Sequence, residues 1–139
     1  MDGKVKLKEV MTEGVVAVDA DSNIVEAANK LRQEDIRGLV VIEDEDAVGV
    51  VVCRDIAYDV IAEGEEARET EVRDIMSTDL IVADEDEVLD DVAMAMSKNK
   101  VSRVPVVRGD MLVGIVTQSD ILRAWPGFAE IMQEEEVNQ

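Results

Sequence analysis

The sequence predicts an α/β fold, of the α+β kind, built from two repeats with the element order β-α-β-β-α. The first observation behind this prediction is internal similarity: Met11 lies 65 residues before Met76, and the same shift aligns the chain without a gap from Met11 to Ile56. The second is that apolar residues recur at helical spacing in some segments and form short runs typical of strands in others. Two copies are too few for a solenoid, so we expect two like units that pack face to face about a pseudo-twofold axis.

The aligned positions keep their chemistry as well as their spacing. Pairs that differ in identity often stay apolar, as with Leu31 and Met96. The two halves are therefore expected to fold alike. The identical pairs include Asp19 and Asp84, Asp21 and Asp86, Ala28 and Ala93, Val41 and Val106, Gly49 and Gly114, Val51 and Val116, and Asp55 and Asp120.

Each repeat is predicted to open with a short strand followed by an amphipathic helix. The strands are Val15–Val18 and Leu80–Ala83, which are short apolar runs. Acidic and amide residues follow at 19–23 and 84–87, where they can cap the free backbone amides at the start of a helix. The helices carry apolar residues at i, i+3, i+4 and i+7, namely Ile24, Ala27, Ala28 and Leu31, and then Leu89, Val92, Ala93 and Met96.

A strand pair and a second helix complete each repeat. Apolar runs at 39–42 and 48–52 flank an acidic turn in the first repeat, and runs at 104–107 and 112–116 flank Arg108-Gly109-Asp110 in the second. The second helices are predicted over 56–62 and from Ile121 through Ala124 onward. The polar composition of residues 65–70 predicts a linker. The domains are therefore predicted at 1–64 and 71–139, and the second domain includes a tail after Trp125.

The composition excludes several classes of function. The chain has 139 residues, 47% of them hydrophobic and 34% charged, as in a soluble globular protein, and has no apolar run long enough to span a bilayer. It has no histidine and a single cysteine, Cys53, which excludes histidine-based triads and an internal disulfide. The net charge of −19 repels nucleic acids and anionic membranes, so neither is expected as a partner. A cytoplasmic protein is expected, and the acidity fits either an ordinary solvated surface or adaptation to high salt.

The segment from Gly114 to Asp120 holds the residues best suited to bind a ligand. Thr117 and Asp120 lie three residues apart at a predicted strand-to-helix turn, and an aspartate can accept hydrogen bonds from both vicinal hydroxyls of a ribose. The hydroxyls of Thr117 and Ser119, with the free amides of the helix, suit a phosphate. The alternative is that Asp120 caps the helix and Thr117 is an ordinary strand residue. Taken alone, the residues favour this structural role.

The paired repeats resemble a tandem pair of cystathionine-β-synthase (CBS) domains, known as a Bateman module. The resemblance rests on Val10-Met11-Thr12 and Ile75-Met76-Ser77, on the run Ser-Arg-Val-Pro-Val-Val at 102–107, and above all on residues 113–122. It extends from about Lys6 to Leu122, which is nearly the whole chain. We therefore expect a stand-alone CBS pair with no fused enzyme.

The resemblance implies an adenosyl ligand and no catalytic cofactor. In CBS pairs a Ser/Thr-x-x-Asp pattern holds the ribose of such a ligand, which implies this role for Thr117 and Asp120. AMP, ADP, ATP and S-adenosylmethionine are the ligands that this implies. Apolar residues on neighbouring strands flank the base in the family, and the residues expected here are Leu80, Val104, Pro105 and Ile115.

The first repeat departs from this pattern. It keeps the acid as Asp55 but has Val52 where the second repeat has Thr117, and Gly38-Leu39-Val40 replaces Arg103-Val104-Pro105. Asp55 could still bind a ribose, with Arg54 near a phosphate. We expect weaker binding there, because one hydrogen bond is worth about 0.5–1.5 kcal/mol.

Basic residues are scarce, so their positions are informative. Lys98, Lys100 and Arg103 cluster just before the second central strand, and the guanidinium of Arg103 suits a phosphate. For the lysines the alternative is a solvated helix end, where positive charge favours the helix C-terminus. If few bases line the pocket, S-adenosylmethionine is favoured over ATP.

These observations predict a non-enzymatic regulatory module. The ligand is expected in the cleft between the two CBS domains, where it signals by changing their relative orientation. The resemblance also implies a homodimer, and an unknown protein partner is possible. The alternative function is a ligand-free dimeric scaffold. The expected contact surfaces are the helix faces Ile56, Ala57, Val60 and Ile61, and Ile121, Leu122 and Trp125.

Overall fold

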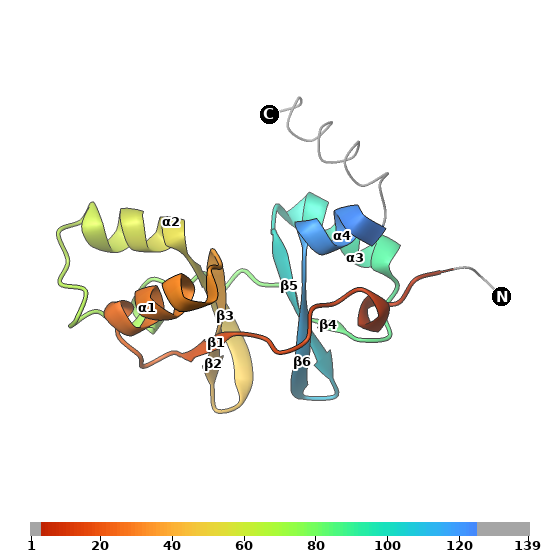
Figure 1. The fold of residues 1–139 in the computed structure, drawn as a ribbon, viewed down its shortest axis with the longest axis horizontal. Coiled ribbons are helices and arrows are strands. Elements are labelled where there is room, and N and C mark those ends of the chain that lie inside the picture. Colours follow the sequence, from red (N-terminus) through yellow and green to blue (C-terminus); the bar gives the residue numbers. More distant parts are fainter. Residues whose placement is uncertain (1–3, 125–139) are drawn as a thin grey trace, which may run out of the picture. The chain divides into compact units, whose positions relative to one another are not determined.

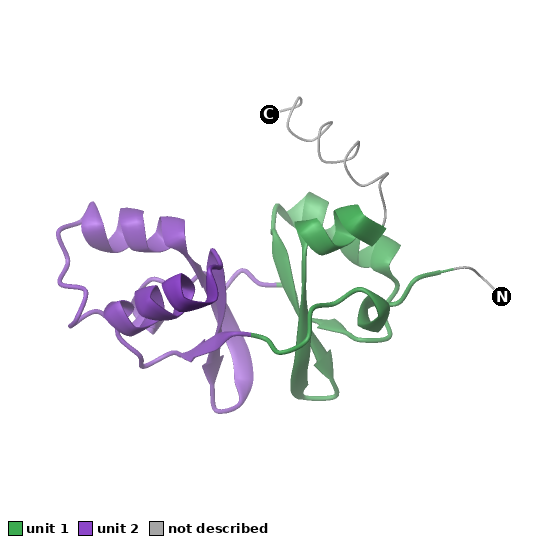
Figure 2. Cartoon of the chain, in the orientation of Figure 1, with its two compact units in different colours: residues 1–15, 81–139 green, residues 16–80 purple. Residues whose placement is uncertain are grey.

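The computed structural model describes residues 4–124 and divides into two compact units (Figure 2). Unit 2 comprises residues 16–80 and holds the body of the first repeat. Unit 1 joins the segment before residue 16 to the chain from residue 81 onward, which holds the body of the second repeat. The predicted C-terminal tail, including Trp125, lies outside the described residues.

Unit 2 contains a three-stranded sheet in the order β1-β2-β3. Strand β1 (Ala17–Asp19) runs parallel to β2 (Gly38–Glu43). Strand β2 then forms an antiparallel hairpin with β3 (Asp46–Val52), which is visible at the bottom of Figure 1. The register of this hairpin shifts between Val41 and Ile42.

Unit 1 repeats this sheet with one informative difference. Strands β4 (Ala83–Asp84), β5 (Arg103–Arg108) and β6 (Met111–Thr117) have the same order and directions. Strand β4 is shorter than β1, whose pairing with β2 starts at Val40. The equivalent of Val40 is Pro105, which has no backbone N–H to donate to a neighbouring strand.

The helices lie where the apolar spacing predicts them. Helices α1 (Ile24–Glu34) and α3 (Leu89–Asn99) cross from the first strand of each sheet to the second. Helix α2 (Cys53–Asp55) continues directly into the π-helical segment η2 (Ile56–Ile61), and α4 (Gln118–Ala124) is its counterpart in unit 1. The predicted α/β fold is therefore confirmed. No helix among residues 4–124 has the length and apolarity needed to cross a membrane.

Each unit has its own buried core, to which sheet and helices both contribute. Buried residues include Ile24, Ala27, Leu31, Leu39, Val41, Val51 and Val60 in unit 2, and Leu89, Val92, Ala93, Met96, Val104, Val106, Val116 and Ile121 in unit 1.

The two repeats exchange their opening segments. The 3₁₀ turn η1 (Leu7–Glu9) opens the first repeat but donates its first amide to the carbonyl of Glu87 in unit 1, at 3.0 Å. The equivalent turn η3 (Val72–Asp74) donates its first amide to the carbonyl of Ser22 in unit 2, at 2.8 Å. The compact units therefore do not coincide with the sequence repeats. The stretch 65–70 belongs to unit 2, where the carbonyl of Thr70 accepts a hydrogen bond from Ile24.

Element boundaries differ from the predicted ones in two ways. The opening strands are shorter, and residues 15, 16 and 80–82 lie outside them, because an apolar run predicts burial and not ladder hydrogen bonds. Val16 and Ile81 do pack against their cores. The second helices begin three residues earlier than predicted, at Cys53 and Gln118.

Candidate functional site

The turn from β6 into α4 brings Thr117 and Asp120 together. Thr117 ends the strand, and Asp120 lies in the first turn of the helix, where its carboxylate reaches back to the strand end. Oδ2 of Asp120 accepts hydrogen bonds from the backbone N–H of Thr117 (2.9 Å) and from its hydroxyl (3.1 Å). The Thr117 hydroxyl in turn accepts from the Asp120 N–H at 3.4 Å. The helix start is thus capped by its own third residue, in the manner of a capping box.

The other carboxylate oxygen of Asp120 has two further donors. Oδ1 accepts a hydrogen bond from the Thr12 hydroxyl at 3.3 Å and forms an ion pair with the guanidinium of Arg123. The Asp120 residue is only 4% exposed, whereas the Arg123 side chain is 71% exposed. The buried carboxylate therefore accepts hydrogen bonds from four donors. One of them, the guanidinium of Arg123, belongs to an exposed side chain.

Thr12 reaches this site because the opening segment pairs with β6. Its backbone exchanges two hydrogen bonds with Ile115, at 2.9 and 3.0 Å. Gly114 makes this approach possible: a Cβ there would lie 2.5 Å from Sδ of Met11. The same arrangement holds in unit 2, where a Cβ on Gly49 would lie 2.8 Å from the Ser77 carbonyl oxygen.

The hairpin β5–β6 places three predicted site residues on the face that bears Thr117. Arg103 pairs directly with Thr117, and Pro105 pairs with Ile115. Residues that pair across an antiparallel ladder have neighbouring side chains on one face. Arg103 and Ile115 are half-buried and Pro105 is buried.

Val104 does not belong with these residues. It alternates with Arg103 and Pro105 along β5, so its side chain points to the opposite face of the sheet. That face is the buried core of unit 1, which Val104 shares with Val116. The place of Val104 in the site stays a prediction.

Ser119 and Leu80 are the other predicted residues of this site. Ser119 is exposed in the first turn of α4. Leu80 is half-buried and is the last residue of unit 2, whereas the residues above belong to unit 1. The place of Leu80 in the site stays a prediction.

The equivalent position in unit 2 has the same backbone and different side chains. Oδ2 of Asp55 accepts from the backbone N–H of Val52 at 2.9 Å, which is its one hydrogen bond among residues 4–124. Arg54 is exposed and lies over the ring of Tyr58, with 5.8 Å between the guanidinium carbon and the ring centroid. Tyr58 occupies the position equivalent to Arg123.

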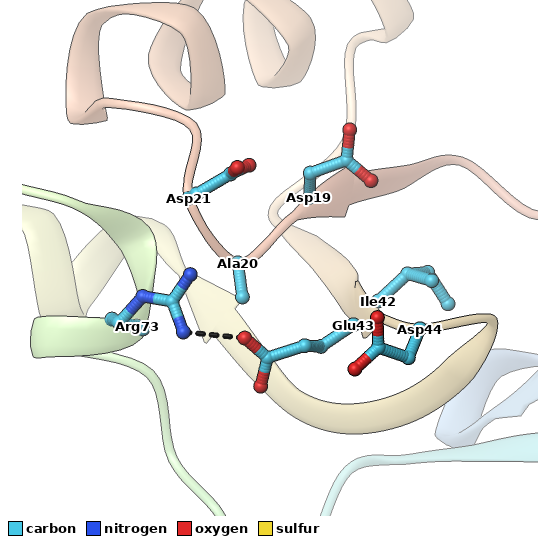
Figure 3. A pocket seen from close by; sticks show the side chains of 7 residues that line it. All are labelled: Asp19, Ala20, Asp21, Ile42, Glu43, Asp44 and Arg73. Carbon is cyan, nitrogen blue, oxygen red and sulfur yellow. Dashed lines mark hydrogen bonds and ion pairs between the residues drawn. The ribbon is translucent and has the colours of Figure 1, made fainter.

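A second feature of unit 2 is an acidic hollow of about 230 Å³ (Figure 3). Arg73 reaches across to Glu43 and also binds Glu71 at 2.8 Å, so a cation of the protein neutralises part of its charge. No group of acids, cysteines or histidines in the described part of the chain has the geometry of a metal site. The hollow is lined by Asp19, Ala20, Asp21, Ile42, Glu43, Asp44 and Arg73.

Thr12 and Arg123 are the site residues that sequence reasoning missed. Arg123 follows Asp120 by three residues, and acid–base pairs at this spacing share one helix face, so the signal was present in the sequence. Thr12 had no comparable local signal, because it reaches Asp120 only through the exchange of opening segments.

Comparison with known families gives a match over most of the chain. The family model described as CBS domain matches twice, at residues 7–61 and 72–127. The CBS domain-containing protein YhcV of Bacillus subtilis is 32% identical over 115 residues, which are 83% of this chain and 81% of that protein. The inosine-5′-monophosphate dehydrogenase of Methanocaldococcus jannaschii is 33% identical over 120 residues, which are 85% of this chain but only 23% of that enzyme.

Solved structures agree with this assignment. The CBS domain pair of protein MJ0100, in complex with 5′-methylthioadenosine and S-adenosyl-L-methionine, is 32% identical with a TM-score of 0.78, and the match covers 89% of this chain and 98% of that one. A hexameric CBS-CP12 protein from bloom-forming cyanobacteria is 29% identical with a TM-score of 0.76, over 91% of this chain and 73% of that one.

Proposed function

The chain belongs to the CBS-domain family as a tandem pair, a regulatory module and not an enzyme, and we propose that it binds an adenosyl ligand at Asp120 in unit 1. The observation that carries the proposal is the buried carboxylate of Asp120 at the end of β6, flanked by the hydroxyls of Thr117 and Thr12. A carboxylate has two oxygens and can accept hydrogen bonds from both hydroxyls of a ribose diol.

The surroundings of Asp120 also suit the rest of such a ligand. Ile115 is half-buried on the face of the sheet that bears Thr117 and offers apolar surface for a base, with the buried Pro105 paired to it. Arg103 lies on the same face at the strand end and supplies positive charge in a chain of net charge −19. The complex of MJ0100 with two adenosyl compounds supports this ligand class.

We propose that the two repeats differ in their affinity for the ligand. Asp55 has neither a threonine at the position of Thr117 nor a basic residue at the position of Arg103, where the first repeat has Gly38. A ligand at Asp55 would rely on the exposed Arg54, so we propose that the second repeat provides the tighter site.

Isothermal titration calorimetry with AMP, ADP, ATP, S-adenosylmethionine and NADH, at low and high salt, tests the proposal. Wild-type protein is expected to bind at least one of the adenosyl compounds. Asp120→Ala should weaken that binding at least about tenfold, because hydrogen bonds to a charged group are lost. Asp55→Ala is the matched control and should weaken it less. Absence of heat with every compound would favour the ligand-free scaffold.

We also propose that the chain forms a homodimer through the outer face of α2 and η2. Tyr58 is 63% exposed and Ile61 is 69% exposed on this helix, and large exposed apolar groups in proximity are typical of protein contacts. The predicted contact residues Val60 and Ile121 are fully buried in their own units, so they do not contribute. The hexameric CBS-CP12 protein shows that relatives assemble.

Sedimentation equilibrium tests the dimer. Ile61→Glu should shift the protein toward the monomer, because a charge would be buried in the contact. Met111→Glu is a suitable control, since Met111 is 64% exposed at the β5–β6 hairpin of unit 1. A monomeric wild type, or equal effects of the two substitutions, would contradict the proposal.

A further inference from the structure

The carboxylate of Asp120 is saturated by donors from the protein itself. A carboxylate has about four acceptor positions, two on each oxygen. Thr117 fills those of Oδ2 with its N–H and hydroxyl, and Thr12 and Arg123 fill those of Oδ1. A ribose diol brings two donors, so it can bind Asp120 only if internal donors give way.

Among these donors, Arg123 is the one most easily replaced. The N–H of Thr117 is backbone and is fixed by the end of β6, and its hydroxyl is also bonded to the Asp120 N–H. Thr12 is held in place by its backbone pairing with Ile115, although its hydroxyl can rotate. Arg123 is a long side chain, 71% exposed, and its guanidinium is readily solvated when released.

Replacing Arg123 has an electrostatic consequence. The Asp120 side chain is only 3% exposed, and a buried charge is unfavourable without a compensating partner. An uncharged adenosyl compound supplies hydrogen bonds but no charge, and leaves the released guanidinium without an anion. A ligand with a phosphate offers that guanidinium a bidentate partner and keeps the positive charge close to the carboxylate.

We propose that Arg123 determines the specificity of the Asp120 site, because it competes with the ligand hydroxyls for the carboxylate and favours adenosyl ligands that carry an anionic group. This inference rests on the proposed function. It also distinguishes the repeats, since the position equivalent to Arg123 is Tyr58, which cannot form an ion pair with Asp55. The Asp120 site should therefore select by ligand charge through this competition, which the Asp55 position lacks.

The test compares AMP with 5′-methylthioadenosine, which share the adenosyl group but differ in charge. Calorimetry is done on wild type, Arg123→Gln, Arg123→Lys and Arg68→Gln. Arg68 is an exposed arginine of unit 2, so its substitution removes the same charge and leaves the hydrogen bonds of Asp120 in place. Wild type should prefer AMP. Arg123→Gln should bind 5′-methylthioadenosine more tightly and AMP less tightly, which lowers the preference at least about fivefold.

Arg68→Gln should leave the preference unchanged, and Arg123→Lys should retain part of it because the positive charge remains. Thermal unfolding of Arg123→Gln checks that the variant is folded. If AMP or 5′-methylthioadenosine binds and Arg123→Gln leaves their ratio as in wild type, this inference alone is overturned. If neither compound binds to wild type or to Arg123→Gln, the proposed adenosyl site fails and the inference fails with it.

Discussion

Asp55 and Asp120 occupy equivalent positions in the two repeats, yet their surroundings differ. Each accepts a hydrogen bond of 2.9 Å from the backbone N–H three residues before it. Asp120 has three further donors, whereas Asp55 has none among residues 4–124. Asp120 is buried and Asp55 is half-buried.

This difference separates what the fold supplies from what side chains supply. The shared hydrogen bond depends only on a strand that turns into a helix, so both repeats have it. The additional donors come from side chains at positions 12, 117 and 123, whose equivalents are Ser77, Val52 and Tyr58. A duplicated fold thus keeps one acid for helix capping and surrounds the other with groups suited to a ligand.

Gly49, one of the two glycines that receive the exchanged segments, gives the largest expected effect on stability. A Cβ on Gly49 would lie 2.8 Å from a backbone oxygen of Ser77, which cannot easily move. A Cβ on Gly114 would meet the flexible side chain of Met11 first, with the Thr12 oxygen at 3.1 Å. Gly49→Ala should lower the free energy of unfolding by about 2–3 kcal/mol and Gly114→Ala by about 1–2 kcal/mol, as for overpacked sites.

Urea denaturation measures both values. Gly109, at a hairpin turn with φ of +61°, provides a control, since a Cβ there would meet nothing within 4 Å. Gly109→Ala tests backbone strain without overpacking. Equal losses for the three substitutions would show that steric contact with the opening segments is not what distinguishes Gly49 and Gly114.

Substitution of Asp120 and of Asp55 should have unequal effects on stability. Asp120→Ala removes the charged acceptor of four hydrogen bonds and should lower the free energy of unfolding by about 1.5–3 kcal/mol. Asp55→Ala removes one capping bond and should lower it by about 1 kcal/mol. Chemical denaturation at neutral pH measures both. A loss at Asp55 as large as that at Asp120 would contradict the view that the extra donors stabilise unit 1.

Exchanging the side chains at positions 52 and 117 gives a smaller effect. Thr117→Val removes one donor to Asp120 and the acceptor for its N–H, and should lower the free energy of unfolding by about 0.5–1.5 kcal/mol. Val52→Thr offers Asp55 the missing donor and should raise stability by less than that amount, since Asp55 is more exposed. Denaturation of both single variants and the double variant measures these changes. If Thr117→Val has no effect, the hydroxyl is not part of the network.

Sequence reasoning predicted the elements whose signals are local. The apolar stripes from Ile24 and Leu89 mark the helices because one helix face must be buried. The pairing of Thr117 with Asp120 was also predictable, since both lie within one turn of each other. The shorter β4 follows from Pro105, although this consequence becomes clear only when the strand partners are known.

The features that the sequence did not predict depend on contacts between residues that are distant along the chain. Nothing in the run around Leu7 indicates that it pairs with Glu87 and not with its own repeat, because both repeats offer equivalent partners. Val104 illustrates a different point. The family pattern names it as a site residue, but alternation along β5 puts its side chain in the core.

The smallest expected effect concerns an ion pair present in one unit only. In unit 1, Lys8 binds Asp86 at 3.0 Å. In unit 2, the equivalent of Lys8 is Arg73, which binds Glu43 and Glu71 and not Asp21, the equivalent of Asp86. The hydrogen bond and charge of Lys8 lower the pKa of Asp86, and Asp86 raises the pKa of Lys8. The pair therefore stabilises the fold above the ordinary aspartate pKa, and this contribution is lost as the pH falls through the lowered value. It is also lost at high pH, as Lys8 deprotonates through its raised pKa.

Asp86→Asn should accordingly reduce stability most at neutral pH, and the difference from wild type should shrink at acid and alkaline extremes. Asp21→Asn is the matched control and should show no such bell-shaped difference. Urea midpoints measured across the pH range give both profiles. Because both side chains of the pair are exposed, the effect should be small and should fall further in 1 M salt, where the screening length is about 3 Å. Identical pH profiles for the two variants would show that the ion pair of unit 1 makes no contribution that unit 2 lacks.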